Sequence, residues 1–350
     1  MHQTRLSMRA VICSLATLLA LSLPASAQAP EKTKSVGFSA ASSPLVKFPF
    51  RIPATGPATL HLQILLDRAH FSPGILDGEW GQNAATALAF FANPETAGRL
   101  TGATPKRPTS IDKATYDRLR DRAGKRPLLK RYRLRPADVA GPFTPIPSDV
   151  YEQAKLKCLC YASTAEAIAE QFHTSPKLLG QLNPHVNIEK MRAGTELLIP
   201  DVADENVSSS MDTVIVAKLI ISKTGFWTHA VGSDGMILAH FPSTLGAGYD
   251  PSPTGAFSVT YVSRDPGFHY QPKLFAEVPN SRPEARLPPG PNSPVGRVWM
   301  SLSKPHYGIH GTSSPETIGY ASSHGCVRLT NWDALQLSDL VESGTPVEFH

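Results

Sequence analysis

Residues 307–329, YGIHGTSSPETIGYASSHGCVRL, hold the densest group of reactive side chains in this chain of 350 residues. His310 and His324 lie on either side of a short spacer, and Cys326 follows with small neighbours. A thiol with an ordinary pKa of about 8.5 is only a few per cent thiolate at neutral pH, so an imidazole is needed to take its proton. Gly325 lets the backbone turn closely, so that successive N–H groups can point at a developing oxyanion. The stretch predicts a cysteine–histidine site for acyl transfer.

Two other interpretations of these residues stay open on the sequence alone. The first is a metal site made of His306, His310, His324 and Cys326. Four residues along a strand cover about 13 Å, which is too far for His306 and His310 to share one ion. The second is structural, with a buried cysteine and histidines that cap neighbouring elements. We expect no metal and no cofactor.

The wider pattern resembles the signature of the YkuD-type L,D-transpeptidases. Twelve residues separate His310 from Ser323, and the run Ser-His-Gly-Cys is followed closely by Arg328. Residues 251–257, PSPTGAF, match the Pro-Thr-Gly-x-Phe motif of that family and stand in the expected order. The resemblance covers residues 211–350. It implies a multidomain α+β chain whose β-rich catalytic domain follows two smaller modules.

The resemblance implies a role for each matching residue. Cys326 is the nucleophile, and His310 is the general base, with its ring oriented by the carbonyl of Gly311. Backbone N–H groups around His324, Gly325 and Cys326 form the oxyanion hole. His324 is nearer in sequence and is the alternative base.

Two further residues of the motif carry less definite roles. Ser323, together with His324, shapes the loop that presents the nucleophile. Arg328 supports that loop through a salt bridge or binds a carboxylate of the substrate.

The family reaction acts on peptidoglycan stem peptides. The nucleophile attacks the diaminopimelate carbonyl of a tetrapeptide stem, D-alanine leaves, and the thioester passes to an amine. That amine is another stem, a free D-amino acid or an outer-membrane protein. A hydrolase of the same fold and a non-catalytic wall-binding protein are the alternatives. The net charge of +5 is too small to indicate a nucleic-acid partner but suits an anionic cell wall.

The N-terminus has the three parts of a secretory signal, assigned to residues 1–27. Arg5 and Arg9 precede an apolar run at residues 10–23, and Ala-Ser-Ala at 25–27 is a small-residue cleavage site. The apolar run is shorter than the roughly 20 residues that span a bilayer, which argues against a membrane anchor. We expect a secreted protein in the periplasm or cell wall, with no membrane anchor after cleavage.

At about 150 residues per domain, 350 residues predict two to three domains. Residues 28–56 are rich in Ala, Ser, Lys and Pro and predict a tether. Residues 57–122 predict three helices, with Asn83 capping the second and the third starting at Ile111. The Gly-Ile-Leu-Asp-Gly run at 74–78 makes this module resemble the peptidoglycan-binding modules of wall enzymes.

Residues 123–147 are basic and then Pro-rich, and they predict a linker or an extended strand packed between modules. Residues 148–203 resemble a LysM module with a βααβ fold, on the order Leu182-Asn183-Pro184 and then Gly194-x-x-Leu197-x-Ile199-Pro200. The Gly-Asp-Thr-Leu that opens most LysM modules is absent. Cys158 and Cys160 are only two residues apart, which argues against a disulfide between them.

The catalytic region predicts strands separated by turns, and one helix that starts at Thr330 with Asp333 as its capping-box acid. Phe257, Val259 and Tyr261 alternate and should share one face. Residues 263–296 are long and Pro-rich, and two interpretations stay open: a lid over the cleft, with Phe268, His269 and Tyr270 contacting substrate, or a surface excursion. The expected strands lie at 213–221, 226–231, 236–241, 256–262, 297–302, 307–310 and 347–349.

Overall fold

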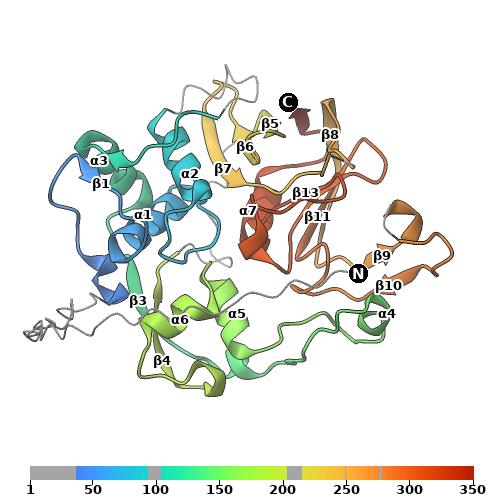
Figure 1. Cartoon of the computed structure of the whole chain (residues 1–350), viewed down its shortest axis with the longest axis horizontal. Coiled ribbons are helices and arrows are strands. Elements are labelled where there is room, and N and C mark those ends of the chain that lie inside the picture. The colour runs from blue at the N-terminus through green and yellow to red at the C-terminus, as the bar shows by residue number, and fades with distance from the viewer. Residues whose placement is uncertain (1–36, 94–103, 203–214, 249, 276–277) are drawn as a thin grey trace, which may run out of the picture. The chain divides into compact units, whose positions relative to one another are not determined.

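The computed structural model describes residues 37–93, 104–202, 215–248, 250–275 and 278–350 (Figure 1). The expected signal at 1–27 and the first part of the expected tether lie outside the described residues. Within the described ranges, no helix combines the length and apolar character that crossing a membrane requires.

The first module contains the three expected helices and a pair of short strands. Nearly every residue of α1 is buried, because the helix packs against both other helices and against residues 38–42. Two boundaries differ from expectation. Asp112, whose side chain accepts a bond from Thr115 N at 2.8 Å, caps the third helix, and Asn83 lies inside the second. The elements are α1 (Pro57–Arg68), α2 (Gln82–Ala92), α3 (Lys113–Ala123), β1 (Phe50–Arg51) and β2 (Ser110–Ile111).

The second module contains the two strands and two main helices expected of a βααβ unit, with a short extra helix before them, and its first strand lies in the segment 123–147, outside the expected bounds 148–203. β3 (Leu129–Arg133) pairs antiparallel with β4 (Glu196–Pro200). Between them come α4 (Val150–Gln153), α5 (Thr164–Gln171) and α6 (Pro176–Leu182). Of the two interpretations of residues 123–147, the extended strand is confirmed at β3 and the linker is wrong there. Leu129 is buried, although basic side chains follow it in the strand.

The structure also corrects the expectation for Cys158 and Cys160, which are joined by a disulfide. Their Cα atoms lie 5.2 Å apart, inside the usual range for bonded cysteines. Two residues of extended strand would span about 6.6 Å, so the backbone bends at Leu159 and brings the two cysteines together. Leu159 forms hydrogen bonds with residues 289 and 292. In the described chain, Cys326 is left as the free cysteine.

The catalytic region is built on an eight-stranded sheet with the order β13-β12-β11-β8-β14-β5-β6-β7. α7 (Asn331–Leu340) packs against β11 and β12. A separate hairpin of β9 (Phe268–Tyr270) and β10 (Ala285–Leu287) extends from this region (Figure 1). The sheet strands are β5 (Lys218–Ser222), β6 (Trp227–Val231), β7 (Ile237–Pro242), β8 (Gly255–Arg264), β11 (Val298–Leu302), β12 (Gly308–His310), β13 (Val327–Arg328) and β14 (Pro346–Phe349).

One expected strand face was wrong. The β8–β11 register shifts so that Ser301 faces Tyr261 while the next residue, Leu302, faces Val259. This bulge reverses the alternation, because one extra residue moves every later side chain to the other face. Tyr261 is consequently 62% exposed, whereas Val259 is fully buried.

The three modules meet at the start of α7. Ser72 Oγ, from the first module, donates to Asp333 Oδ2 at 2.9 Å. His173, from the second, stacks on Trp332 and bonds to Asp67 at 2.9 Å. The carboxylate of Asp333, expected to close a capping box, therefore faces the first module.

Asp333 makes this junction sensitive to pH. Burial, and then the charge of Asp67, raise the pKa of Asp333 to about 7, although hydrogen bonds from Ser72 and Thr330 oppose the shift. A carboxyl with a raised folded-state pKa stabilises the fold below its unfolded pKa, and this contribution is lost as pH rises through the folded value.

We expect Asp333→Asn to become increasingly stable relative to the parent protein between pH 4 and pH 8. The difference in unfolding free energy should grow by a few kcal/mol, since each unit of pKa shift corresponds to about 1.4 kcal/mol. Urea unfolding at several pH values measures it. A difference that does not vary with pH would contradict the raised pKa.

Candidate active site

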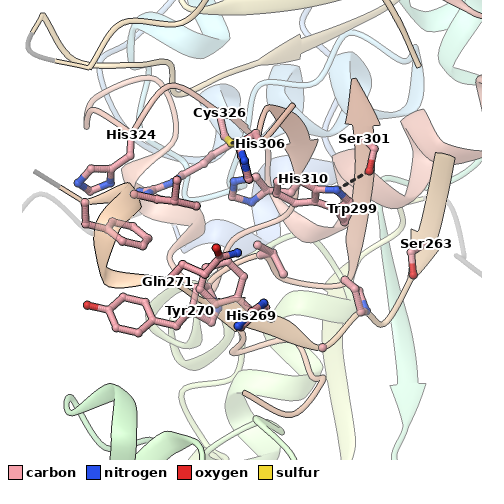
Figure 2. Close-up of a pocket in the computed structure, with 18 of the residues that line it drawn as sticks. Ser263, His269, Tyr270, Gln271, Trp299, Ser301, His306, His310, His324 and Cys326 are labelled. Carbon is pink, nitrogen blue, oxygen red and sulfur yellow. Dashed lines mark hydrogen bonds between the residues drawn. The ribbon is translucent and has the colours of Figure 1, made fainter. Parts of the chain in front are cut away.

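The site is assembled by β12 and β13, which run parallel and adjacent. Ile309 faces Val327 and His310 faces Arg328 across this pair. Cys326 immediately precedes β13, so the register brings the two halves of the motif together. They line a cavity of about 720 Å³ (Figure 2).

The ring of His310 is fixed on two sides. Its Nδ1–H donates to the Gly311 carbonyl at 2.7 Å, so the contact expected from the sequence is present. Because a carbonyl only accepts, Nε2 is the nitrogen left to accept a proton. Trp299 stacks on the ring with centroids 5.4 Å apart, and its Nε1–H donates to Ser301 Oγ at 2.8 Å.

Burial keeps both reacting groups neutral. It lowers the pKa of His310 to about 3, with the charge of Arg328 acting in the same direction and the Gly311 bond opposing. Burial also raises the pKa of the Cys326 thiol, against the opposing effects of a Gly308 backbone bond and Arg328. The resting state is therefore a thiol and a neutral imidazole. The thiol donates to the His306 carbonyl at 3.7 Å.

The loop that carries Cys326 is held by its own side chains and by a neighbouring segment. Ser323 Oγ donates to the Cys326 carbonyl at 2.5 Å. Gly325 has a φ of +91°, and a Cβ there would lie 2.8 Å from the Tyr307 ring, so the turn requires glycine. These contacts fix the backbone conformation of the loop beside β12.

Ser252 supports the loop that carries Cys326, and the sequence reasoning missed this contact. It lies in the PSPTGAF run, which was used only as a family signature. Its Oγ donates to the Gly325 carbonyl at 2.8 Å and accepts from Gly246 N at 2.9 Å. A small hydroxyl residue between two prolines, before a strand, is the signal that could have indicated this role.

His324 and Arg328 occupy different places around the nucleophile. His324 packs edge-to-face on Phe275 with ring centroids 4.9 Å apart, and Figure 2 shows it across Cys326 from His310. Arg328 faces His310 on the adjoining strand. Of the predicted site residues, the pocket is lined by His310, His324, Cys326 and Arg328, whereas Gly311, Ser323 and Gly325 support it from behind the lining.

No metal site emerges from these residues. Across the described part of the chain, no three His, Cys, Asp or Glu side chains gather closely enough to hold an ion.

The wall opposite Cys326 comes from the segment 263–296. Phe268, His269 and Tyr270 line the pocket from β9, and Figure 2 shows the last two across from the nucleophile. The ring of His269 is bonded to Glu284 of the same hairpin at 2.8 Å. The segment therefore borders the cleft, as the lid hypothesis requires. Its effect on substrate choice stays a prediction.

Sequence comparisons place this site among known proteins. The YkuD family model, described as the L,D-transpeptidase catalytic domain, matches residues 217–349. A putative L,D-transpeptidase YkuD of Bacillus licheniformis is 32% identical over 184 residues, covering 53% of this chain and 92% of the relative. The Bacillus subtilis protein of the same name is 30% identical over the same length and the same shares. A crystal structure of the L,D-transpeptidase from Xylanimonas cellulosilytica, 17% identical, covers 88% of this chain and 99% of its own with a TM-score of 0.35.

The raised pKa of Cys326 predicts slow alkylation at neutral pH. Burial disfavours the thiolate, so the rate with iodoacetamide should rise through a midpoint above the ordinary value of about 8.5. Because the imidazole of His310 stays neutral over the pH range of the experiment, the plot of alkylation rate against pH should show no inflection near pH 6.5. The pH profile of alkylation, with N-acetylcysteine as reference, measures this. A rate plateau that begins below pH 7 would instead indicate a thiolate–imidazolium pair.

Ser252→Ala should weaken the nucleophile loop. Removing a buried hydroxyl leaves Gly325 O and Gly246 N without this partner, which costs about 1–3 kcal/mol of unfolding free energy. Denaturant unfolding measures the loss. The matched control is Ser343→Ala, which removes an exposed bond to Thr260 O and should change stability by less than about 0.5 kcal/mol. If both substitutions lowered the unfolding free energy equally, Ser252 would stabilise the protein no more than an exposed serine does, and the prediction would be wrong.

Proposed function

Because this chain belongs to the YkuD-type L,D-transpeptidase family, we propose that it is an exported enzyme that transfers peptidoglycan stem peptides through a thioester on Cys326. The observation that supports the proposal is the β12–β13 register, which brings the side chains of His310, Cys326 and Arg328 to one pocket. The family acts on peptidoglycan, so the donor is a tetrapeptide stem.

The first half-reaction forms the thioester. Cys326 Sγ attacks the diaminopimelate carbonyl carbon while His310 Nε2 takes the thiol proton. Backbone N–H groups around His324, Gly325 and Cys326 stabilise the oxyanion. The tetrahedral intermediate then collapses, and the C–N bond to D-alanine breaks as His310 returns the proton to its nitrogen.

The second half-reaction passes the acyl group to an amine. The amine attacks the thioester, His310 accepts its proton, and the thiolate leaves and is reprotonated. A neutral imidazole suits both steps, because only the unprotonated ring can accept a proton. A low pKa makes His310 a weak base in the resting protein, so its proton affinity must rise once the negative charge develops beside it.

The acceptor and the location are parts of the same proposal. The acceptor is a second stem, which gives a 3→3 cross-link, or a D-amino acid or protein amine. The apolar N-terminal segment would direct the chain to the periplasm, where the helical and LysM-like modules would hold it on the wall.

The direct test incubates the parent protein and Cys326→Ala with purified tetrapeptide muropeptides, followed by mass spectrometry. A product equal to two stems less one D-alanine is expected with the parent. It should fall at least about 10³-fold in the variant, as for loss of other catalytic nucleophiles. If a tripeptide is the only product, the enzyme hydrolyses the stem instead of transferring it, and the proposed transfer would be wrong. No reaction with stems, D-amino acids or protein amines would overturn it in favour of a wall-binding role.

The identity of the base is tested by His310→Gln and His324→Gln. Loss of general-base catalysis should lower kcat about 10²–10⁴-fold for His310→Gln. His324→Gln retains the backbone N–H groups and the contact surface for Phe275, so its kcat should change far less. The reverse order of effects would assign the base to His324.

A further inference from the structure

The second module reaches into the catalytic pocket through a long insertion. We call residues 140–163, between β3 and α5, the arm. Among the residues that line the cavity, Val150 and Gln153 come from α4 of this arm, and Figure 1 places α4 beside the β9–β10 hairpin. The pocket around Cys326 is thus completed by a part of the chain far outside residues 211–350.

The arm is fixed in shape by its own contacts. Thr144 N donates to Tyr161 O at 3.3 Å where the two ends of the arm meet, and the disulfide between Cys158 and Cys160 lies next to this closure. Gln153 Nε2 donates to the Pro147 carbonyl at 2.7 Å. This bond orients the amide, because the carbonyl requires its nitrogen, and it leaves Oε1 as an acceptor.

The arm also supports the hairpin from behind. Tyr151 OH donates to the Pro283 carbonyl at 2.9 Å, and its ring packs edge-to-face on Tyr270 with centroids 6.3 Å apart. Leu159 is fully buried against Ala285 and Leu287 of β10. Tyr270 therefore contacts the pocket on one side and the arm on the other.

The backbone contact between arm and hairpin segment is close. Leu159 N donates to Pro289 O and Leu159 O accepts from Asn292 N, both at 2.9 Å. Gly290 lies between these partners, and a Cβ there would be 2.2 Å from Leu159 O. The close approach of these two segments depends on this glycine, which has a φ of +149°.

The chemistry of the composite wall indicates what it binds. In the described lining there is no aspartate or glutamate, and the permanent charge is that of Arg328. The wall itself is apolar at Val150 and Phe268, with neutral amides at Gln153 and Gln271. The neutral amides offer hydrogen-bond partners to a peptide backbone, and the apolar side chains pack against its aliphatic parts.

From these contacts we infer that the arm is a specificity element in which Gln153 Oε1 accepts a hydrogen bond from a backbone N–H of the peptide substrate. This inference rests on the proposed function for the identity of that peptide. It assigns to the second module a direct part in substrate binding at the catalytic pocket, separate from any attachment to glycan.

The test compares Gln153→Ala with Glu152→Gln. Glu152 lies on the same helix, is exposed, and pairs with Lys155 away from the pocket. Binding of a tetrapeptide stem is measured by calorimetry in the Cys326→Ala background. One lost neutral hydrogen bond should raise Kd about 3- to 10-fold for Gln153→Ala, and Glu152→Gln should leave it unchanged.

Turnover separates a binding role from a structural one. In the otherwise unaltered enzyme, Gln153→Ala should raise KM by the same factor and leave kcat within about twofold, because the chemistry at Cys326 is untouched. An unchanged Kd and KM while the parent enzyme turns over stems would overturn the inference and leave the proposed function standing.

If the parent enzyme turns over no stem, the proposed function fails, and the arm is then tested by alkylation of Cys326. Val150→Trp narrows the pocket from the arm. It should slow modification by a peptide-sized maleimide at least about fivefold, with little effect on iodoacetamide, since a large side chain excludes large reagents first. Equal effects on both reagents, or none, would show that the arm does not bound the site.

Discussion

The parallel pairing of β12 with β13 is the constraint on which the rest of the site depends. Only the pairs Ile309–Val327 and His310–Arg328 form it, and both hydrophobic members are fully buried. On its other side, β13 exchanges two backbone bonds with Thr244, from Arg328 N and to Arg328 O, at 2.8 and 2.9 Å. The two-residue strand β13 is thus hydrogen-bonded along both of its edges. A one-residue shift in its register would turn every side chain of β13 to the opposite face. The loop between the strands is anchored as well, because Asn83 Nδ2 of α2 donates to Ile318 O at 2.8 Å.

The first and second modules contact the catalytic region at α7. Asn331, its first residue, accepts from Arg297 N at 3.0 Å and donates to Glu170 Oε1 of α5 at 3.0 Å. The same helix begins at Asn331, shortly after β13 ends at Arg328, so these contacts lie next to the strand that carries Arg328. The buried Asp333 lies in the same turn. The modules that precede the catalytic region are therefore part of its structural support.

The sequence predicted the parts of this protein that local patterns specify. Three helices in 57–122, the hairpin of β6 and β7, and the reactive residues all followed from periodicity and motif spacing. It left a strand at β3 as one of two interpretations, because Lys130, Arg131 and Arg133 obscure the apolar pattern and the partner strand, Glu196–Pro200, is more than sixty residues away. The disulfide was missed because spacing alone does not reveal that the backbone bends at Leu159 and brings the two Cα atoms to 5.2 Å. Ser252 and Gln153 were missed because their roles arise only when distant segments meet.

Because the arm lines the catalytic pocket, the active site includes residues that lie outside the catalytic region of the sequence. A fragment cut before residue 211 would retain the nucleophile, the base and the whole family signature. It would nevertheless lose Val150 and Gln153 from the cavity, remove the ring of Tyr151 from Tyr270, and expose Trp332 where His173 now stacks. Evolution by exchange of whole modules would meet the same difficulty, since a replacement for the second module must also supply a wall for the cleft. The catalytic region and this module are therefore expected to be inherited together.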